Sequence, residues 1–438
     1  MNGGRIYSIW LASGIGSAPG AYHSLIKEFG TPEGVYRSDL AGERPDLSPS
    51  VLRALREKDL SAARFVLDYC TTHRIRVLTP EDRDYPATLR ELPDLPAALY
   101  VRGQLPDLSA VPAVALVGTR TMSGYGLLRA YDLGFGCGAG GAVVVSGMAA
   151  GSDAAALAGC IDAGGVPVAV LGCGVDRAYP RRHAYLMEEI VRRGAVLSEY
   201  VPGSEILPSH FPERNRIISG LSRAVCVVEA PQKSGAMITA SLAEKQGKLL
   251  FSVPGPVGIA GSEGTNDLLR RGAQPALEPD DILRGFLFLY PDRIRVSAAR
   301  PRGAEEAERA LTVHRLDPGA LLGKEKRRES SPPLAEDPSG ESRTKSEKKK
   351  KAPFRFSLLP KKEEKEPEAS APDGREEILS RLDAKTAALY RTLPEGKAFL
   401  PDEAVSGEYR IGEIMCALTV LEVNGLVRAL PGGRFLLS

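Results

Sequence analysis

The chain has 438 residues, of which 43% are hydrophobic and 26% are charged, and its formal net charge at pH 7 is +2. This length exceeds what one hydrophobic core usually supports, so we expect two or three domains. The six cysteines are far apart and lack CxxC spacing, which excludes a dense disulfide framework and favours a reducing compartment. No window resembles a secretory core or a membrane span, so we expect a cytoplasmic protein that does not enter a membrane.

Residues 1–75 predict a small helical domain of the SAM or helix-hairpin-helix kind. Short helical patterns are interrupted there by "SGIGSAPG" and "FGTPEGVY". The turn around Gly14-Ile15-Gly16 offers backbone N–H groups to a phosphate, although a plain tight turn explains the glycines at least as well. Residues 76–107 contain prolines that oppose regular helix, and we expect an extended connector.

Residues 108–290 predict the main domain, an α/β fold with a Rossmann-like, doubly wound and mostly parallel sheet. The short runs "AVALV", "AVVVS", "VPVAVL", "AVLS", "AVCVVEA" and "KLLFSV" mostly alternate with helix-length intervals. Each run is apolar nearly throughout, as strands covered on both faces require. Ligands of such sheets bind beyond the carboxyl ends of the strands, so the residues after each run form the candidate site.

The loop after the first run, "VGTRTMSGYG", is a candidate anion site. Gly118 and Gly126 let a backbone approach closely, Ser123 supplies a hydroxyl, and Arg120 supplies a positive charge. The following helix presents its N-terminus to the same place. The spacing fits neither a dinucleotide-binding GxGxxG motif nor a Walker loop.

Two further loops repeat this chemistry. The stretch "SGMAAGSD" supplies Ser146 and Gly147, and Asp153 is a candidate cap for the next helix. The stretch "GCGVDRAYPRRH" contains Tyr179, which either stacks on a base or packs within its own loop.

Positive charge is predicted to gather at one edge of the sheet. Residues 108–290 contain sixteen basic and sixteen acidic residues, yet Arg214 and Arg216 of "FPERNR" and Lys233 of "EAPQKSG" are all assigned to the edge that carries Arg120. Such a patch attracts a phosphate backbone. Asn215 is expected to hold its turn through hydrogen bonds to the backbone.

The sequence contains few candidate catalytic residues. His183 and His210 have no recognisable nucleophile or orienting acid, and no cluster has metal-ligand spacing, so we expect neither an enzyme nor a metal or cofactor site. Glu199, Glu229 and Glu244 are available as acids or bases, but salt bridges to arginines explain them better. Glu229 in particular is expected to orient Arg214 and Arg216.

The last third of the chain has two parts. Residues 297–373 are rich in Lys, Glu, Arg, Pro and Ser, which predicts a disordered charged linker. Residues 374–438 contain amphipathic helical patterns followed by "VRALPGGRFLL", where Gly432-Gly433 is able to turn a hairpin, and together these suggest a winged-helix module. Its few basic residues favour a protein contact or a structural cap over groove reading.

The motifs of the central domain together resemble the DNA-processing protein A family (DprA/Smf). They include "VGTRTMSGYG", "SGMAAGSDAAALAGC", "AVLGCGVDRAYP", "LSEY", "FPERNRIISGLSRAVCVVEA", "SGAMITASLAEKQGK" and "VPGPVGIAGSEGTNDLLRRGA". The resemblance implies a domain that binds single-stranded DNA, self-associates as a homodimer and loads RecA recombinase during natural transformation. By motif, Arg120, Arg214, Arg216 and Lys233 would line the DNA pocket. The residues implied for its floor are Gly118, Ser123, Gly126, Ser146, Gly147, Ser234 and Gly235.

Two positions depart from the family pattern. Thr119 stands where the family usually has serine, and Leu157 stands where it usually has histidine, which puts any role of that histidine in doubt here. Two alternatives stay open. One is a nucleotide hydrolase resembling the phosphoribohydrolases, with Glu229 or Glu244 assisting glycosidic cleavage, although "SGAMIT" lacks their PGGxGT pattern. The other is an adaptor that acts mainly through its linker and tail.

Overall fold

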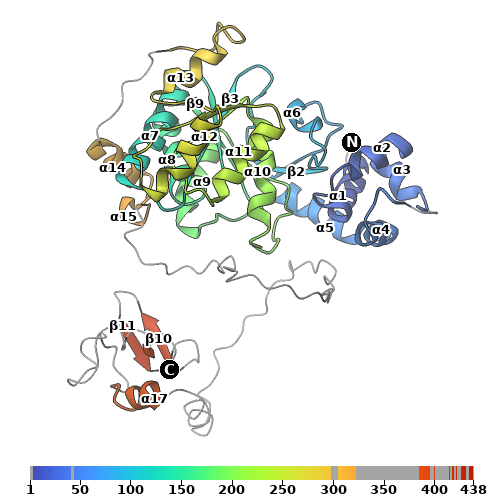
Figure 1. Cartoon of the computed structure of the whole chain (residues 1–438). Helices are drawn as coiled ribbons and strands as arrows, with labels where there is room; N and C mark the ends of the chain where they lie inside the picture. Colours follow the sequence, from blue (N-terminus) through green and yellow to red (C-terminus); the bar gives the residue numbers. More distant parts are fainter. Residues whose placement is uncertain are drawn as a thin grey trace, which may run out of the picture. The chain divides into compact units, whose positions relative to one another are not determined.

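The computed structural model describes residues 3–40, 44–296, 304–321 and 384–394, with residues 399, 414, 417–418, 421, 426–430 and 434–437 of the C-terminal part. The chain divides into two compact units, Met1–Leu358 and Leu359–Ser438, and each is described by itself (Figure 1). No helix in the described ranges is both long enough and apolar enough to span a membrane.

Five short helices form the N-terminal part of the first unit, as the sequence predicted. They are α1 (Gly3–Ile15), α2 (Ala21–Phe29), α3 (Pro32–Arg37), α4 (Pro49–Arg56) and α5 (Ser61–Thr72). Thr31 and Ser48 cap α3 and α4 by accepting backbone N–H bonds, and Leu25 and Leu55 are completely buried. Gly14 packs against α4, because a Cβ there would lie 2.6 Å from Leu55 Cδ2. That contact explains Gly14 without a phosphate.

The predicted connector is part of the sheet. Residues 76–107 contain β1 (Arg76–Leu78), α6 (Ala87–Arg90) and β2 (Leu99–Gly103). β1 pairs antiparallel with β2, and β2 pairs antiparallel with a strand of the main sheet, Ala195–Ser198. The prolines do prevent a long helix, but they fall between the strands and leave "LYVRG" free to pair.

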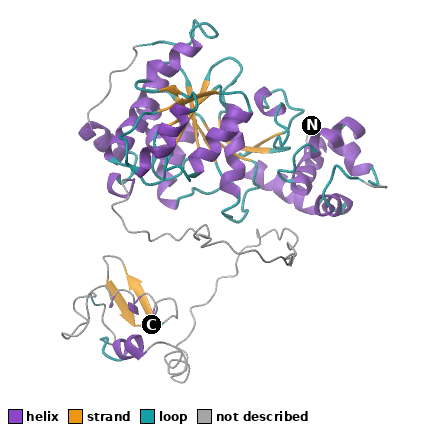
Figure 2. Cartoon of the chain, viewed as in Figure 1, coloured by secondary structure: helices purple, strands orange, loops and turns teal. Residues whose placement is uncertain are grey.

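One nine-stranded sheet forms the centre of the first unit, and its parallel part confirms the predicted α/β class. The remaining strands are β3 (Ala113–Val117), β4 (Val143–Ser146), β5 (Val166–Val170), β6 (Ala195–Ser198), β7 (Ala224–Val227), β8 (Leu249–Ser252) and β9 (Gln274–Pro275). The order is β1-β2-β6-β5-β4-β3-β7-β8-β9, and β3 to β9 pair in parallel wherever they are neighbours. Strands β3, β4, β6 and β7 are buried along their whole length, because helices cover both faces (Figure 2).

The helices between these strands form two layers. They are α7 (Gly124–Ala139), α8 (Ser152–Asp162), α9 (Ala184–Arg193), α10 (His210–Leu221), α11 (Gly235–Lys245), α12 (Ala260–Arg270) and α13 (Pro279–Leu283), with short 3-10 turns at Arg181–His183 and Arg284–Phe286. α7 and α8 approach very closely, since a Cβ on Gly134 would lie 2.0 Å from the carbonyl oxygen of Ala156. Leu157 is completely buried in the middle of α8.

Part of the predicted linker is folded. Residues 304–321 form α14 (Ala304–Val313) and α15 (Pro318–Leu321), and α14 packs on α7 and α8. Ala307, Leu311, Leu316 and Leu321 are buried in the main core. The average composition of residues 297–373 concealed these few apolar positions, of which Ala307 and Leu311 are four residues apart and so lie on one side of α14. Residues 297–303 and 322–373 lie outside the described part of the chain.

The second unit contains α17 (Ala384–Tyr390) and a hairpin of β10 (Val427–Leu430) and β11 (Arg434–Leu437). The antiparallel pairing confirms the predicted hairpin around Gly432-Gly433. Phe399 bridges to Phe435, and both side chains are buried in a small separate core. The winged-helix assignment depends on residues that are mostly outside the described ranges, so it stays a prediction.

Because α7 and α8 approach so closely, one added methyl group between them should destabilise the protein. Gly134→Ala should lower the free energy of unfolding by about 1–3 kcal/mol, because the new Cβ overlaps the backbone of α8. Gly124→Ala on the same helix is the control, since a Cβ there meets nothing within 4 Å. Urea unfolding of both variants measures the difference, and equal stabilities would contradict the packing argument.

Candidate nucleic-acid interface

The carboxyl ends of the parallel strands meet at one edge of the sheet, with the strand order reversing between β3 and β7. The chain runs outward from β3 through β4 and β5 to β6, then returns to place β7 beside β3. In such sheets the loops after the two central strands diverge and leave room for a ligand. Eleven of the twelve predicted site residues lie in the loops or helix ends of this edge or contact them, and Arg216 is the exception.

Glu229 follows β7 and occupies the N-terminus of α7. Its carboxylate accepts the Ser123 backbone N–H at 3.0 Å and the Ser123 hydroxyl at 3.1 Å, and Ser123 Oγ in turn accepts the Gly126 N–H. Gly126 is needed there, because a Cβ would lie 1.7 Å from a carboxylate oxygen of Glu229. Burial raises the pKa of Glu229, and the two Ser123 bonds oppose that shift.

Two predictions about this loop are therefore wrong. The N-terminus of α7 already holds a negative charge, because the Glu229 carboxylate accepts the Ser123 N–H and hydroxyl and interacts favourably with the helix dipole, while Ser123 Oγ accepts the Gly126 N–H. Glu229 also makes none of its hydrogen bonds to Arg214 or Arg216, so it orients the β3 loop and not the arginines. The sequence correctly assigned Glu229 to this edge of the sheet. Its hydrogen-bond partners lie in the β3 loop because β3 and β7 are neighbours in the sheet.

Arg120 is exposed at the tip of the β3 loop. Its guanidinium carbon lies 5.3 Å from the centre of the Phe211 ring, and no ion pair to it occurs among the residues the structure describes. Phe211 also packs on Tyr179, with ring centres 5.1 Å apart. An exposed cation above one aromatic ring, with a second ring packed beside it, is a combination that suits nucleic-acid phosphates and bases. Tyr179 therefore packs within the edge and still presents part of its ring.

The β4 loop is held by buried polar groups. Ser146 donates its hydroxyl to the Leu116 carbonyl at 2.6 Å and is fully buried, so it is structural and does not face a ligand. Asp153 lies in the first turn of α8 and accepts the Gly147 N–H at 3.1 Å, so it holds the preceding loop and is not the expected cap of the helix, whose N-cap residue is Gly151. Gly147 leaves space for Arg214, since a Cβ would lie 2.4 Å from the guanidinium.

Arg214 lies beneath the site and not on its surface. Its side chain extends from α10, donates to the carbonyl oxygens of Gly147 and Val170, and is only 4% exposed as a residue. Burial lowers the pKa of Arg214 to about 10, opposed by the nearby Asp153 carboxylate. The guanidinium remains charged at neutral pH, and it joins the loops after β4 and β5 to α10.

Arg216 faces away from Arg214 and is neutralised by two carboxylates. It binds Glu199 through two hydrogen bonds, at 2.8 and 2.6 Å, and its Nε lies 3.2 Å from Asp94. Only 3% of Arg216 is exposed. The prediction that both arginines of "FPERNR" reach the pocket assumed a loop, whereas these residues form helix α10 and their side chains diverge by position around it.

The loop after β7 supplies the other free cation. Lys233 is exposed and has no ion pair within the described ranges, and it precedes the N-terminus of α11, where Gly235 has open space around it. Asn215 donates to the Gly235 carbonyl at 3.3 Å, so its side chain links α10 to the first residue of α11 and does not hold a turn of its own segment, which is helical. Ser234 is the residue before α11, and its hydroxyl has no partner among the described atoms.

The sequence interpretation overlooked two groups at this edge. Phe211 was hidden inside "FPERNR", and Arg181 and Arg182 form an exposed pair in the loop after β5. His183, which the sequence offered only as a catalytic candidate, is fully buried and bonds the Met148 carbonyl at 2.9 Å. The adjacent arginines after a parallel strand were a usable signal. The aromatic pair was not, because Tyr179 and Phe211 are far apart in sequence.

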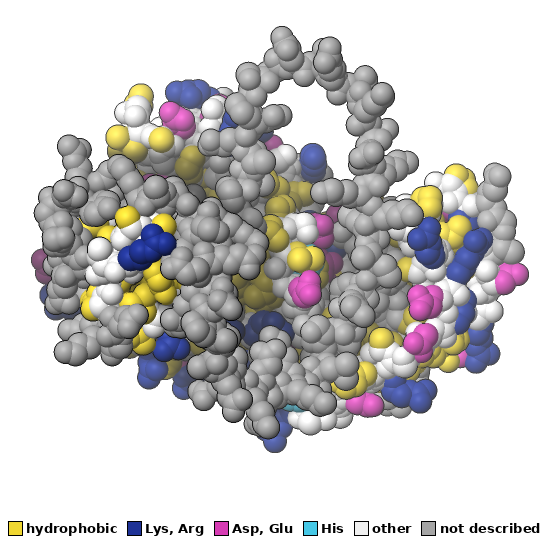
Figure 3. Space-filling model, turned by 90° about the horizontal axis from the view of Figure 1, so that it is seen from below, with side chains coloured by type: hydrophobic (Ala, Val, Ile, Leu, Met, Phe, Trp, Pro, Cys, Tyr) yellow, Lys and Arg dark blue, Asp and Glu magenta, His cyan; other side chains and the backbone are white. Residues whose placement is uncertain are grey.

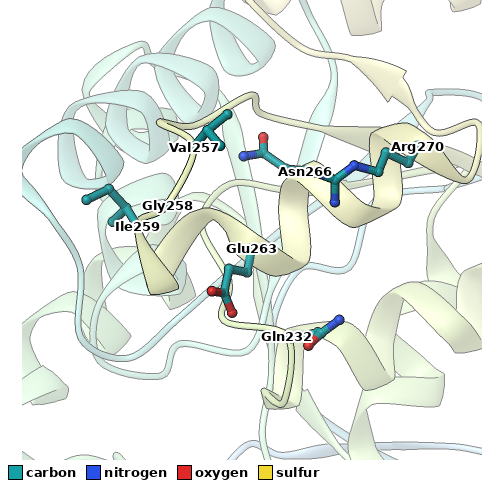
Figure 4. A pocket seen from close by; sticks show the side chains of 7 residues that line it. All are labelled: Gln232, Val257, Gly258, Ile259, Glu263, Asn266 and Arg270. Atoms are coloured by element: carbon teal, nitrogen blue, oxygen red, sulfur yellow. The ribbon is translucent and has the colours of Figure 1, made fainter.

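A pocket of about 330 Å³ lies beside the Lys233 loop. Its lining comes from the loops after β7 and β8 and from α12, and comprises Gln232, Val257, Gly258, Ile259, Glu263, Asn266 and Arg270 (Figure 4). Glu263 extends from α12 towards the Gln232 loop, whereas Arg270 lies farther along the helix. One acidic and one basic side chain leave this pocket without a net charge, so it does not extend the positive edge.

On the face shown in Figure 3, basic and acidic side chains are interspersed over the N-terminal helices, at the right of the view. Within the described ranges, no group of three or more His, Cys, Asp or Glu side chains is arranged to hold a metal ion. Cys137 and Cys160 are fully buried, and burial raises the pKa of Cys137 to about 12, so its thiol is unreactive.

Comparison with known proteins identifies the family. A family model described as DNA recombination-mediator protein A matches residues 76–287. Protein Smf of Synechocystis is 41% identical over 209 residues, which cover 47% of this chain and 52% of that protein. The DNA processing protein DprA of Streptococcus pneumoniae is 40% identical over 207 residues, which cover 47% of this chain and 73% of that protein. The chain belongs to the DprA/Smf family.

The match coincides with the sheet domain. Residues 76–287 begin at β1 and include all nine strands, which agrees with the finding that the supposed connector belongs to the sheet. The X-ray structure of DprA from S. pneumoniae has a TM-score of 0.55 and 32% identity, and covers 64% of this chain and 97% of that one. The chain spans only about half the length of the Synechocystis family member.

The buried charge pair predicts a structural role for Arg216. Arg216→Ala should lower the free energy of unfolding by about 3–5 kcal/mol, because Glu199 is left nearly buried without its partner. Arg271→Ala is the control, since its 2.6 Å pair with Glu244 is exposed and should contribute less than about 1 kcal/mol. Urea unfolding measures both, and similar losses in the two variants would refute this role.

His183 predicts a dependence of stability on pH. Burial lowers its pKa from 6.5 to about 4 in the folded chain, so the unfolded chain binds the proton first as the pH falls. The contribution is fully present above pH 6.5 and is lost towards pH 4, at up to about 1.4 kcal/mol per pH unit. His183→Asn keeps a donor for the Met148 carbonyl but does not titrate. Its unfolding free energy should fall less between pH 7 and pH 5 than that of the parent, and an equal fall would contradict the assignment.

Proposed function

We propose that this family member binds single-stranded DNA along the carboxyl edge of its sheet and acts there in DNA recombination. The observation that carries the proposal is Arg120, an exposed guanidinium without an ion pair in the described part of the chain, held over the Phe211 ring. Lys233 supplies a second free cation from the loop after the neighbouring strand β7. The family description, a DNA recombination mediator, supports the same role.

The chemistry of the edge favours a single strand over a duplex. Phe211 and Tyr179 are partly exposed aromatic residues beside Arg120, and bases stack on such rings only when they are not already stacked in a duplex. Exposed basic side chains at the edge offer positive charge to the phosphates of a DNA strand, without an arrangement of donors and acceptors that is specific for a base. They are Arg120, Lys233, Arg181 and Arg182. We therefore expect binding that tolerates different sequences.

The finer role is proposed from the family resemblance. A bound strand would be protected and handed to RecA recombinase by a homodimer, in natural transformation or in general recombination. Deleting residues 322–438, which leaves the packed residues 304–321 in place, separates the parts. Intact DNA binding with lost RecA loading would show that the deleted tail contacts the partner. Loading that survives the deletion would place it in the first unit.

We further propose that the edge binds without catalysing a reaction. Glu244 lies near the C-terminal end of α11, opposite the edge, and pairs with Arg271. Glu229 is held by Ser123. Neither carboxylate is placed as the acid or base that glycosidic cleavage requires. Incubation with nucleoside monophosphates and chromatography for released base tests this, and sustained turnover would contradict it.

The proposal predicts different effects for two exposed arginines. Arg120→Ala should weaken binding to an oligo-dT strand roughly tenfold and reduce the salt slope of log K by about 0.7, because one phosphate contact is lost. Arg271→Ala should change neither, since Arg271 pairs with Glu244 away from the edge. Fluorescence anisotropy across a salt series measures both quantities. Binding that is unaffected by Arg120→Ala, or independent of salt, would refute the proposed site.

A further inference from the structure

Residues 304–321, which we call the α14–α15 strap, lie beyond the part of the chain that the family model matches. They nevertheless pack on the domain that carries the proposed site. Leu311, Leu316 and Leu321 are each at most 3% exposed and belong to the main core. A segment with such buried residues is held in place and is not a free tether.

The strap has a polar anchor at the far end of α8. His314 is 4% exposed, and its Nε2 lies 2.8 Å from a carboxylate oxygen of Asp162, the last residue of α8. The other Asp162 oxygen accepts the Tyr131 hydroxyl of α7 at 2.7 Å. Arg315 then places its guanidinium 4.8 Å from the Tyr185 ring of α9. The strap therefore contacts the three helices that support the loops after β3, β4 and β5.

The other end of the strap reaches the loop that carries Arg120. The Leu321 carbonyl accepts the Met122 N–H at 3.2 Å. Elsewhere in the loop, the Thr119 and Ser123 N–H groups both bond to Glu229, through its carbonyl and its carboxylate respectively. The Thr121 N–H bonds to the Thr119 hydroxyl at 3.2 Å. Thr121 and Met122, the two residues that follow Arg120, are thus held by a local bond and by the strap, respectively.

We propose that the α14–α15 strap is a positioning element for Arg120. His314 fixes the strap to Asp162, and Leu321 fixes the β3 loop through Met122, so that Arg120 stays above the Phe211 ring in the free protein. Holding a binding group in its bound position lowers the entropy that binding must remove. This inference rests on the proposed function only for its effect on DNA, since the hold on the loop is a property of the chain alone.

Hydrogen exchange in the full-length chain tests the hold. His314→Ala should accelerate exchange of the Met122 amide about tenfold, because the loss of a buried hydrogen bond to a carboxylate frees the strap to open locally. His314→Gln keeps an N–H donor for Asp162 and should restore slow exchange. Val313→Ala changes a neighbouring residue that is 69% exposed and should have no effect. Amides of β3 report any general loosening and should keep their rates in all three variants.

Affinity for oligo-dT tests the consequence. His314→Ala should weaken binding several-fold, and His314→Gln should restore it, with Arg120→Ala as the reference for loss of the site. Unchanged Met122 exchange in His314→Ala would overturn the inference. Faster Met122 exchange in His314→Ala without a loss of affinity would also overturn it, provided that Arg120→Ala does weaken binding. If His314→Ala fails to fold, Leu321→Ala loosens the other end of the strap and is read in the same way.

The two proposals fail separately. If the parent chain has no affinity for oligo-dT, the proposed function fails, and the exchange rates alone decide whether the strap holds the loop. If the parent binds and Arg120→Ala does not, the function stands whatever the strap variants show.

Discussion

The arrangement of the carboxyl edge depends on how its buried charges are satisfied. Arg214 donates to the carbonyl oxygens of Gly147 and Val170, and so joins the loops after β4 and β5 to α10. Glu229 joins the loop after β3 to the end of β7. A buried charge without partners is strongly destabilising, so these groups fix the loops in one arrangement. The loops of the edge are therefore fixed before any ligand binds, and the side chains exposed on its surface are not needed to hold them.

This division separates the cations into two classes. Arg214 and Arg216 are almost completely buried, and their guanidinium groups are hydrogen-bonded to carbonyls or carboxylates of the same chain. Arg120 and Lys233 are exposed and unpaired within the described ranges. A phosphate gains from a cation only when that cation is not already neutralised. The positive character of a domain with equal numbers of acidic and basic residues therefore comes from a few free side chains.

The strap adds a third level of support from outside the residues that the family model matches. Its bond to Met122 reaches the same loop that Glu229 holds from the other side, so Arg120 is positioned by segments far apart in sequence. Support of this kind controls how much freedom a binding loop loses on binding. It also explains why a stretch with a linker's average composition contains buried leucines.

The sequence by itself determined the fold class, the six main parallel strands, the edge that carries the site, and the family. These follow from local patterns, since apolar runs between helical intervals permit few other arrangements. Which side chains reach the surface of that edge was decided only by tertiary structure. Arg214 and Arg216 are two residues apart, so a helix turns them to different neighbours, whereas an extended segment would have placed both on one face. The partners of Glu229, Arg120 and Leu321 are likewise distant in sequence, and only folding brings them together.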